Sequence, residues 1–327
     1  MNGFNKYYSF ILIVLIGIVG CKKNQMKDSC KLELHKTINN IDDSIYFSNI
    51  SSITEYKSLI YLNDYKNNRI IILEKDLELN AIIGHSGKGP GEMKGSLNLE
   101  IVNDTIVAID DHNERINIYD IHGNFIRSFK NPVLNLGMSR IAVGNDLSIY
   151  ETVDFKAHFI YRIDPVNGKI INKFGEKHTS ILFPQDSIHT NGHLLYHDNK
   201  LIYVSQYEPI IEKYSVLGVL EQRHFFTELI SDSLLEKSLH YHKSHEKTSR
   251  MSLFMDAYIY DKSLYIKSLK NEILVFTLYP EIDFDKRLYL GNETHFFWKI
   301  AVYDNFIITQ NLMNQELQLY ELECFHK

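Results

Sequence analysis

The chain carries the stretch RIIILEKDLELNAIIG at Arg69–Gly84, and the stretch RINIYDIHGNFIRSFK at Arg115–Lys130 aligns with it without gaps at an offset of 46 residues. In each stretch an alternating apolar segment is followed by a polar turn and a second alternating segment. Period-2 alternation is typical of a β-strand, and a short polar turn between two such strands indicates a β-hairpin. The repeat therefore predicts a fold built from consecutive antiparallel units.

The same unit recurs along the whole chain. The last large apolar residue of its first strand recurs at intervals of 44 to 62 residues, at Leu73, Tyr119, Ile163, Tyr214, Phe276 and Tyr320. A period of roughly 50 residues is typical of a four-stranded propeller blade. We expect an all-β, six-bladed β-propeller with four antiparallel strands per blade and blades near 51–93, 97–132, 138–178, 191–228, 251–292 and 294–325. The 21 Tyr and 18 Phe fit this fold, because aromatic side chains favour strands.

The last unit is one strand short, since the chain stops at Lys327. Residues 31–50 offer two spare strand candidates, KLELHK and SIYFSN. An open sixth blade would leave an unpaired strand edge, which promotes aggregation. We therefore expect an N-terminal strand to close the last blade.

Residues 228–250 lack β alternation and predict a helical insertion between the fourth and fifth blades. Ser233 and Glu236 have the spacing of a capping box, and leucines follow at helical intervals. Four acidic and four basic residues make the segment neutral and solvated.

The stretch GHSGKGPGEM at Gly84–Met93, followed by DDHNERINIYD and GNFIRSF, resembles NHL-type repeats. It is similar to the six-bladed β-propeller lipoproteins of Gram-negative bacteria, in which a GxGPGE loop follows the first blade. The resemblance is strong over residues 69–129, and it implies architecture and cellular address but no catalytic residue.

The GxGPGE loop itself is predicted to be a turn. We expect Gly87, Gly89, Pro90 and Gly91 to give a tight, φ-positive path between blades, and Glu92 to bond backbone amides there. A phosphate-binding loop with Lys88 is the alternative. It is disfavoured because strand-like residues, not a helix N-terminus, follow the glycines.

Residues 1–20 predict a secretory signal peptide, with Lys6 before an apolar run too short to span a membrane. Ile18-Val19-Gly20-Cys21 resembles the bacterial lipobox, which implies that Cys21 is lipidated and that residues 21–30 form a tether. The expected location is the cell envelope, anchored by lipid at the outer membrane, on its periplasmic face or at the cell surface. A secreted protein without lipid is the alternative.

Cys30 and Cys324 form the remaining cysteine pair. If KLELHK lies antiparallel to the last strand, these two residues become neighbours, and the compartment permits a disulfide. Two free thiols remain the alternative, and closure by SIYFSN would weaken the geometric reason.

Metal and cofactor sites find little support among the fifteen histidines. The densest set is His240, His242 and His245 in the insertion, where a solvated helix lacks rigidly held third and fourth ligands. We expect no metal and no cofactor.

Catalysis in propellers generally uses polar residues of the innermost strands, which face the central funnel. The predicted inner strands read as mainly apolar and aromatic, with His193, His197 and Asp256 as their few titratable residues. The sequence has no GxSxG, HExxH or CxxC motif, so nucleophilic and zinc-hydrolase chemistry lack their residues.

The composition excludes a nucleic-acid partner. The chain of 327 residues has 35 Lys and Arg against 41 Asp and Glu, a formal net charge of −6, and no basic stripe. We expect a monomeric, membrane-anchored binding module without a catalytic set of residues. Its partner is a small molecule, a glycan or an envelope protein, because propeller faces and funnels are concave and loop-rich. The alternative is a lyase- or lactonase-type enzyme with its site in the funnel.

Overall fold

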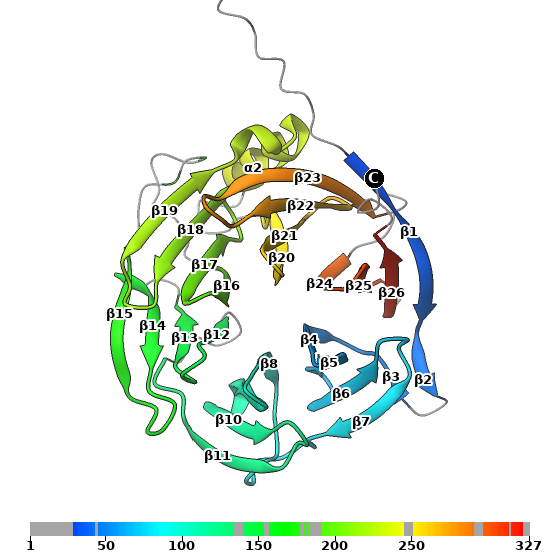
Figure 1. Cartoon of the computed structure of the whole chain (residues 1–327), viewed down its shortest axis with the longest axis vertical. Coiled ribbons are helices and arrows are strands. Elements are labelled where there is room, and N and C mark those ends of the chain that lie inside the picture. Colours follow the sequence, from blue (N-terminus) through cyan, green and yellow to red (C-terminus); the bar gives the residue numbers. More distant parts are fainter. Residues whose placement is uncertain are drawn as a thin grey trace, which may run out of the picture.

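The computed structural model describes residues 29–42, 45–133, 140–153, 157–176, 180, 182, 191–244, 251–290, 297–313 and 315–322. Its antiparallel sheets stand side by side around a central axis, as the ring in Figure 1 shows. The first two blades are β4 (Ile50–Tyr56), β5 (Leu59–Asp64), β6 (Arg69–Glu74) and β7 (Leu79–Ile83), then β8 (Ser96–Val102), β9 (Thr105–Asp110), β10 (Arg115–Asp120) and β11 (Phe125–Lys130).

The third and fourth blades repeat this order. They are β12 (Ile141–Val143), β13 (Ile149–Thr152), β14 (His158–Ile163) and β15 (Ile170–Glu176), then β16 (Gly192–His197), β17 (Lys200–Ser205), β18 (Ile210–Ser215) and β19 (Leu220–Phe225). The last two are β20 (Phe254–Tyr260), β21 (Ser263–Ser268), β22 (Glu272–Thr277) and β23 (Asp283–Leu290), then β24 (Phe297–Tyr303), β25 (Phe306–Asn311), β26 (Glu316–Glu321) and β1 (Ser29–Ile38). The predicted six-bladed, four-stranded architecture is confirmed.

The N-terminal strand closes the ring, as predicted. β1 pairs antiparallel with β26, from Glu33 opposite Glu321 to Ile38 opposite Leu317. Its first residues also pair in parallel with β23, so β1 joins the fifth and sixth blades into one eight-stranded sheet. KLELHK is therefore the closing segment. The segment SIYFSN contributes only β3 (Ile45–Tyr46), which pairs with β2 (Asn40–Asp42).

The hydrophobic core lies between adjacent blades. Phe226, Phe254 and Phe276 meet between the fourth and fifth blades, with the Phe226 ring 5.2 Å and 5.1 Å from the other two. Phe159 and Tyr203 meet in the same way between the third and fourth blades, at 4.8 Å. Offset and edge-to-face ring contacts add to the energy of burial, which explains why this sequence is rich in Phe and Tyr.

The sequence repeat corresponds to a structural one at the end of each third strand. Five of its six anchor residues follow a β-bulge in the pairing of the third and fourth strands: Leu73, Tyr119, Ile163, Tyr214 and Phe276. A bulge increases the local twist of a strand pair, so the anchors occupy equivalent positions in their blades.

The predicted insertion contains the helix α2 (Asp232–Ser244), preceded by the 3-10 turn η2 (Thr227–Leu229). The backbone carbonyl of Ser231 accepts the amides of Leu234 and Leu235, so the helix begins ahead of the predicted start at Ser233. Leu234 is buried against the core between the fourth and fifth blades, and α2 lies at the outer rim in Figure 1.

The GxGPGE loop is held by hydrogen bonds from and to charged side chains. Glu92 Oε2 accepts the Gly89 amide at 2.5 Å, and this bond lowers the pKa of Glu92. Of the loop glycines, Gly91 has a positive φ of 77°, whereas Gly87 and Gly89 do not. The φ-positive path expected for those two is therefore wrong. Gly87 instead leaves room for the Glu92 side chain, because a Cβ at this position would lie 2.0 Å from the Glu92 carboxylate.

Arg115 fixes this loop from the neighbouring strand. It donates to the carbonyls of Lys88, Gly89 and Glu92 at 3.1, 2.9 and 2.7 Å, and to Asp110 at 2.9 Å. Asp110 also accepts the Lys94 amide at 2.7 Å. The loop is thus a structural joint that sets the start of β8, a strand that lines the central axis.

Several predictions concern residues outside this description. The signal peptide, Cys21, the tether up to residue 28 and Cys324 all lie outside the described residues. Cys30 is disulfide-bonded. Within the described part of the chain, no helix is long and apolar enough to cross a membrane.

Candidate functional site

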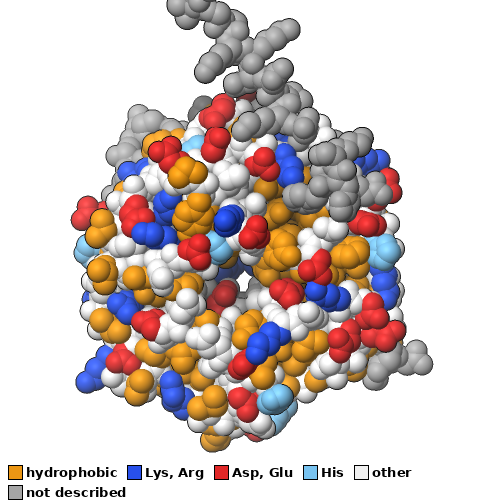
Figure 2. Space-filling view, in the orientation of Figure 1, with side chains coloured by type: hydrophobic (Ala, Val, Ile, Leu, Met, Phe, Trp, Pro, Cys, Tyr) orange, Lys and Arg blue, Asp and Glu red, His pale blue; other side chains and the backbone are white. Residues whose placement is uncertain are grey.

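A cavity of about 150 Å³ lies on the axis, where the inner strands β4, β8, β12, β16, β20 and β24 converge. Figure 2 shows the opening at the centre of one face, with charged side chains beside it. One water molecule needs about 15 Å³ of such space, so the cavity holds a ligand of roughly ten non-hydrogen atoms.

Every blade contributes at least one polar side chain to the lining of this cavity, and we take one from each. In chain order they are Ser52, Asn98, Arg140, His193, Asp256 and Lys299, and we call them the funnel ring. Their intervals of 42 to 63 residues follow the blade repeat. The ring is therefore a direct product of the six-fold repetition.

Four ring residues lie within or directly after a β-bulge in their inner strand. The register shifts between Ile50 and Ser52, and between Ser96 and Leu99, on either side of Asn98. It shifts again directly before Asp256 and directly before Lys299. Bulges redirect side chains and are frequent beside functional sites. Here they set which residue of each inner strand faces the axis.

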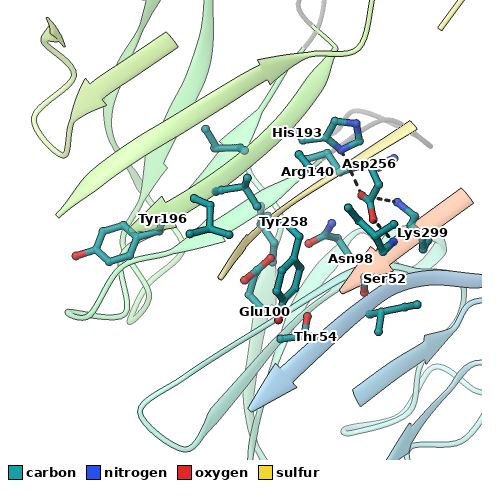
Figure 3. Close-up of a pocket in the computed structure, with 17 residues that line it drawn as sticks. Ser52, Thr54, Asn98, Glu100, Arg140, His193, Tyr196, Asp256, Tyr258 and Lys299 are labelled. Atoms are coloured by element: carbon teal, nitrogen blue, oxygen red, sulfur yellow. Dashed lines mark hydrogen bonds and ion pairs between the residues drawn. The ribbon is translucent and has the colours of Figure 1, made fainter. Parts of the chain in front are cut away.

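Asp256 is the centre of the charged end of the cavity. Its Oδ2 accepts the Ile300 amide at 2.9 Å, and its Oδ1 lies 3.4 Å from Lys299 Nζ and 3.5 Å from His193 Nδ1. Figure 3 shows these three side chains and Arg140 gathered together. Charge-assisted bonds are usually 2.7–2.9 Å long, so the two ion-pair contacts of Asp256 are loose.

Burial controls the protonation of the basic groups. It lowers the pKa of Lys299 to about 8, although the carboxylate of Asp256 opposes the shift, and Arg140 lowers this pKa further. Burial also holds the pKa of His193 well below its usual range, and Arg140 and Lys299 add to that effect. At neutral pH, His193 is therefore neutral, while Lys299 keeps most of its charge.

The opposite end of the cavity is formed by Thr54, Glu100 and Tyr258 (Figure 3). Burial, and secondarily the charge of Asp256, raises the pKa of Glu100 to about 8. Burial likewise raises the pKa of Tyr258, whose hydroxyl oxygen accepts the Glu55 amide at 3.1 Å. Glu100 is thus mainly a neutral carboxyl group at pH 7.

Three polar atoms of the ring are buried without a hydrogen-bond partner among the described residues. They are Ser52 Oγ, Asn98 Oδ1 and His193 Nε2. A buried polar atom without a partner costs about 1–3 kcal/mol. Three such atoms around one cavity indicate a site that a ligand or water completes.

The structure brings together two of the three predicted funnel residues, His193 and Asp256. His197 does not line the cavity. It lies four residues farther along β16, beside Asp198 at 3.7 Å and with its ring 5.9 Å from that of Tyr279.

The inner strands contain more titratable residues than His193, His197 and Asp256, so that part of the expectation is wrong. Glu100, Arg140 and Lys299 line the cavity as well, and a comparison of equivalent positions once per blade would have found them. Bulges obscured that comparison, because they change which residues of a strand share a face.

Of the three candidate histidines of the insertion, two lie within the described residues. His240 is exposed on α2, His242 is buried, and His245 lies outside the described residues. Across the described ranges, no group of three or more His, Cys, Asp or Glu residues has the arrangement to hold a metal ion.

A second hollow, of about 600 Å³, opens between the first and second blades. Its lining residues Lys57 and Asp104 already pair at 2.7 Å, and both are exposed. Exposed ion pairs contribute little energy. None of the described residues that line this hollow has a buried side-chain atom without a hydrogen-bond partner, so the hollow is a weaker candidate than the funnel.

Comparison with known proteins supports the fold. A family model described as 6-bladed beta-propeller matches residues 40–227. No curated protein matches the chain in sequence.

Three solved structures are similar in fold. One is a protein of Bacteroides fragilis described as exported (TM-score 0.61, 15% identity, 89% of this chain and 98% of that chain). Another is virginiamycin B lyase from Staphylococcus aureus (TM-score 0.54, 12% identity, 89% and 99%). A streptogramin B lyase is similar to the same degree (TM-score 0.56, 14% identity, 88% and 87%). At these identities the similarity shows the fold alone.

Proposed function

Because this chain belongs to the 6-bladed beta-propeller family, we propose that it is a binding module of the cell envelope, anchored by a lipid on Cys21, with a small polar ligand in its central funnel. The observation that carries this proposal is the set of three buried, unpartnered atoms on Ser52, Asn98 and His193. They come from three different blades, so no local rearrangement of one strand satisfies them together.

The electrostatics of the funnel fit binding. Lys299 and Glu100 have pKa values of about 8, and such shifts gather at functional sites. The cavity lies on the axis of a rigid ring of sheets, which holds its polar groups in place without the ligand. Such preorganisation reduces the entropy that binding costs.

The direct test is to identify what the protein carries. Full-length protein is purified in detergent, denatured, and its small-molecule extract is analysed by mass spectrometry. We expect a stoichiometric compound that is absent from the Asn98→Phe variant, in which the new ring fills the cavity. The matched control is Asn80→Phe in the outer hollow, which retains the compound. Equal ligand content in both variants would place the binding site elsewhere.

The anchor is tested separately. Cys21→Ser removes the lipidated side chain, so we expect the protein to move from the membrane pellet to the soluble fraction after cell lysis. Lys22→Ser is the neighbouring control and leaves partitioning unchanged. A Cys21→Ser protein that stays with the membrane would contradict lipid anchoring.

A lyase- or lactonase-type enzyme is the second candidate. It is favoured by the juxtaposition of His193 and Asp256 and by the near-neutral pKa values of Glu100 and Lys299, which suit proton transfer at pH 7–8. The fold shared with virginiamycin B lyase carries no activity by itself. Elemental analysis separates the two: one stoichiometric calcium or zinc, lost in Asp256→Asn, would favour the enzyme.

A further inference from the structure

At the charged end of the funnel, Lys299 has no close carboxylate partner among the described residues. Lys299 is only 2% exposed, and the nearest carboxylate oxygen in the described residues lies 3.4 Å from its Nζ. The same oxygen of Asp256 also faces His193, and its other oxygen accepts a hydrogen bond from the Ile300 amide. A buried ammonium group is stable only with close, well-oriented partners, so this site is incomplete for Lys299.

This end of the cavity gathers three basic side chains, those of Arg140, His193 and Lys299. The three side chains lie together beside Asp256 (Figure 3), and Arg140 lowers the pKa of both Lys299 and His193. Glu100 lies at the other end and is mainly protonated at neutral pH, so it does not compensate the cations. A singly charged anion fits here, because its carboxylate would supply the close partner that Lys299 lacks among the described residues.

The atoms beside this end call for a hydrogen-bond donor. Asn98 Oδ1 is an acceptor without a partner among the described residues, and Ser52 Oγ is also unpartnered. In Figure 3 both side chains lie between the Asp256–Lys299 end and the Glu100–Tyr258 end. A ligand hydroxyl would donate to Asn98, whereas a ligand ammonium would be repelled by Lys299.

We propose that the funnel binds a small hydroxycarboxylate, with its carboxylate beside Lys299 and Arg140 and its hydroxyl at Asn98 and Ser52. This assignment rests on the proposed binding function and names the chemical class of the ligand. The cavity of about 150 Å³ suits a molecule of this size. A site built to hydrogen-bond a hydroxyl also discriminates strongly against analogues that lack it.

The test is calorimetric titration of the full-length protein in detergent with three matched probe pairs. Glycolate and lactate are compared with acetate and propionate, which lack the hydroxyl, and with glycolamide and lactamide, which lack the charge. We expect the hydroxycarboxylates to bind at least tenfold more tightly than either set of analogues. Inorganic phosphate and sulfate test whether other oxyanions fit better.

Variants assign the binding to the funnel. Lys299→Met removes the cation and keeps the length of the side chain, and we expect glycolate affinity to fall at least tenfold. Asn98→Leu removes the acceptor, so it should abolish the preference for glycolate over acetate while acetate binding persists. Lys57→Met in the outer hollow is the matched control and changes neither.

The pH profile supplies an independent measurement. Lys299 is faced by Asp256, Arg140 and His193, with Glu100 at the far end of the cavity. Between pH 7 and pH 9, Lys299 loses its positive charge and Glu100 gains a negative one, since both titrate at about pH 8. Both changes disfavour an anion, so affinity should fall by up to tenfold per pH unit for each group above pH 8.

The outcomes separate the two proposals. Amides that bind as tightly as carboxylates, with binding still lost in Asn98→Phe, would overturn the hydroxycarboxylate assignment and leave the funnel as a binding site. Tighter binding of phosphate or sulfate would overturn the carboxylate assignment in the same way. Binding of none of the probes would overturn it too, while a different co-purified compound would preserve the proposed function.

Discussion

The network around Asp110 and Arg115 in the second blade and the group around Asp256 and Lys299 in the funnel are both buried sets of charges, and they are completed differently. Asp110 accepts bonds of 2.7 to 3.3 Å from Lys94, Asn113, Arg115 and Asn117. Asp256 makes one short bond and two loose ion-pair contacts. The first set is closed within the protein, whereas the second leaves room for another molecule.

Buried charges of this fold can be sorted by whether their hydrogen-bond partners lie within the protein. Arg115 uses its remaining donors on three loop carbonyls, so the network joins two blades. The funnel ring keeps atoms without a partner among the described residues on Ser52, Asn98 and His193. The cavity is also lined by Lys299 and Glu100, whose pKa values are each about 8. Stability should therefore depend on the first set, and ligand binding on the second.

The largest expected effect is on the structural network. Arg115→Ala leaves Asp110 buried with its charge uncompensated and removes the donors to the GxGPGE loop. We expect the free energy of unfolding to fall by about 3–5 kcal/mol, measured by urea denaturation. The control is Arg162→Ala, whose partner Asp146 is 59% exposed, with an expected loss below about 1 kcal/mol. Equal losses in the two variants would contradict a special role for the Arg115 network.

A smaller effect, of opposite sign, is expected at Glu100. Its pKa is raised from 4.5 to about 8 in the folded protein, so the folded state binds the proton more tightly. The resulting contribution to stability is full below pH 4.5 and is lost as pH rises through 8. Glu100→Gln has no such loss, so its free energy of unfolding should exceed that of the wild type by about 1–3 kcal/mol at pH 8.

Urea unfolding at pH 5, 6.5 and 8 measures this difference. The exposed substitution Glu78→Gln is the control and should leave the pH profile unchanged. Parallel profiles for Glu100→Gln and the wild type would show that Glu100 titrates normally and that its burial is not costly.

The smallest effect is expected for Lys299→Met. Its pKa is lowered from 10.5 to about 8, so burial costs the ammonium more than Asp256 returns, and wild-type stability rises between pH 8 and 10.5. We expect a change within about 1 kcal/mol at pH 7 and loss of that alkaline rise. A loss of 3 kcal/mol or more in urea unfolding would make the Asp256–Lys299 pair structural, like the Arg115 network.

The first two blades show how far sequence patterns reach. The hairpins at Arg69–Gly84 and Arg115–Lys130 follow from period-2 alternation and a polar turn, which are local properties of the chain. The N-terminal closing strand follows from counting strands per repeat. The parallel pairing of β1 with β23 carries no local signal, because it depends on where the fifth blade ends in space.

The candidate site was only partly predictable. The sequence predicts His193 and Asp256 as titratable residues of inner strands. It does not predict Lys299, Arg140 and Glu100, which have apolar neighbours in the chain. His197 has the same residue type and the same strand as His193, yet it lies away from the cavity. Residue type alone does not tell how far along the axis a side chain lies.

The sequence by itself determined the repeat, the strand pattern and the closure of the ring, because alternation and period are written in neighbouring residues. Only the tertiary structure decided which side chains meet on the axis. The bulges before Ser52, Asp256 and Lys299 shift the register of each inner strand by one residue, and such a shift turns a side chain from one face to the other. The funnel ring exists because side chains from all six blades meet on the axis.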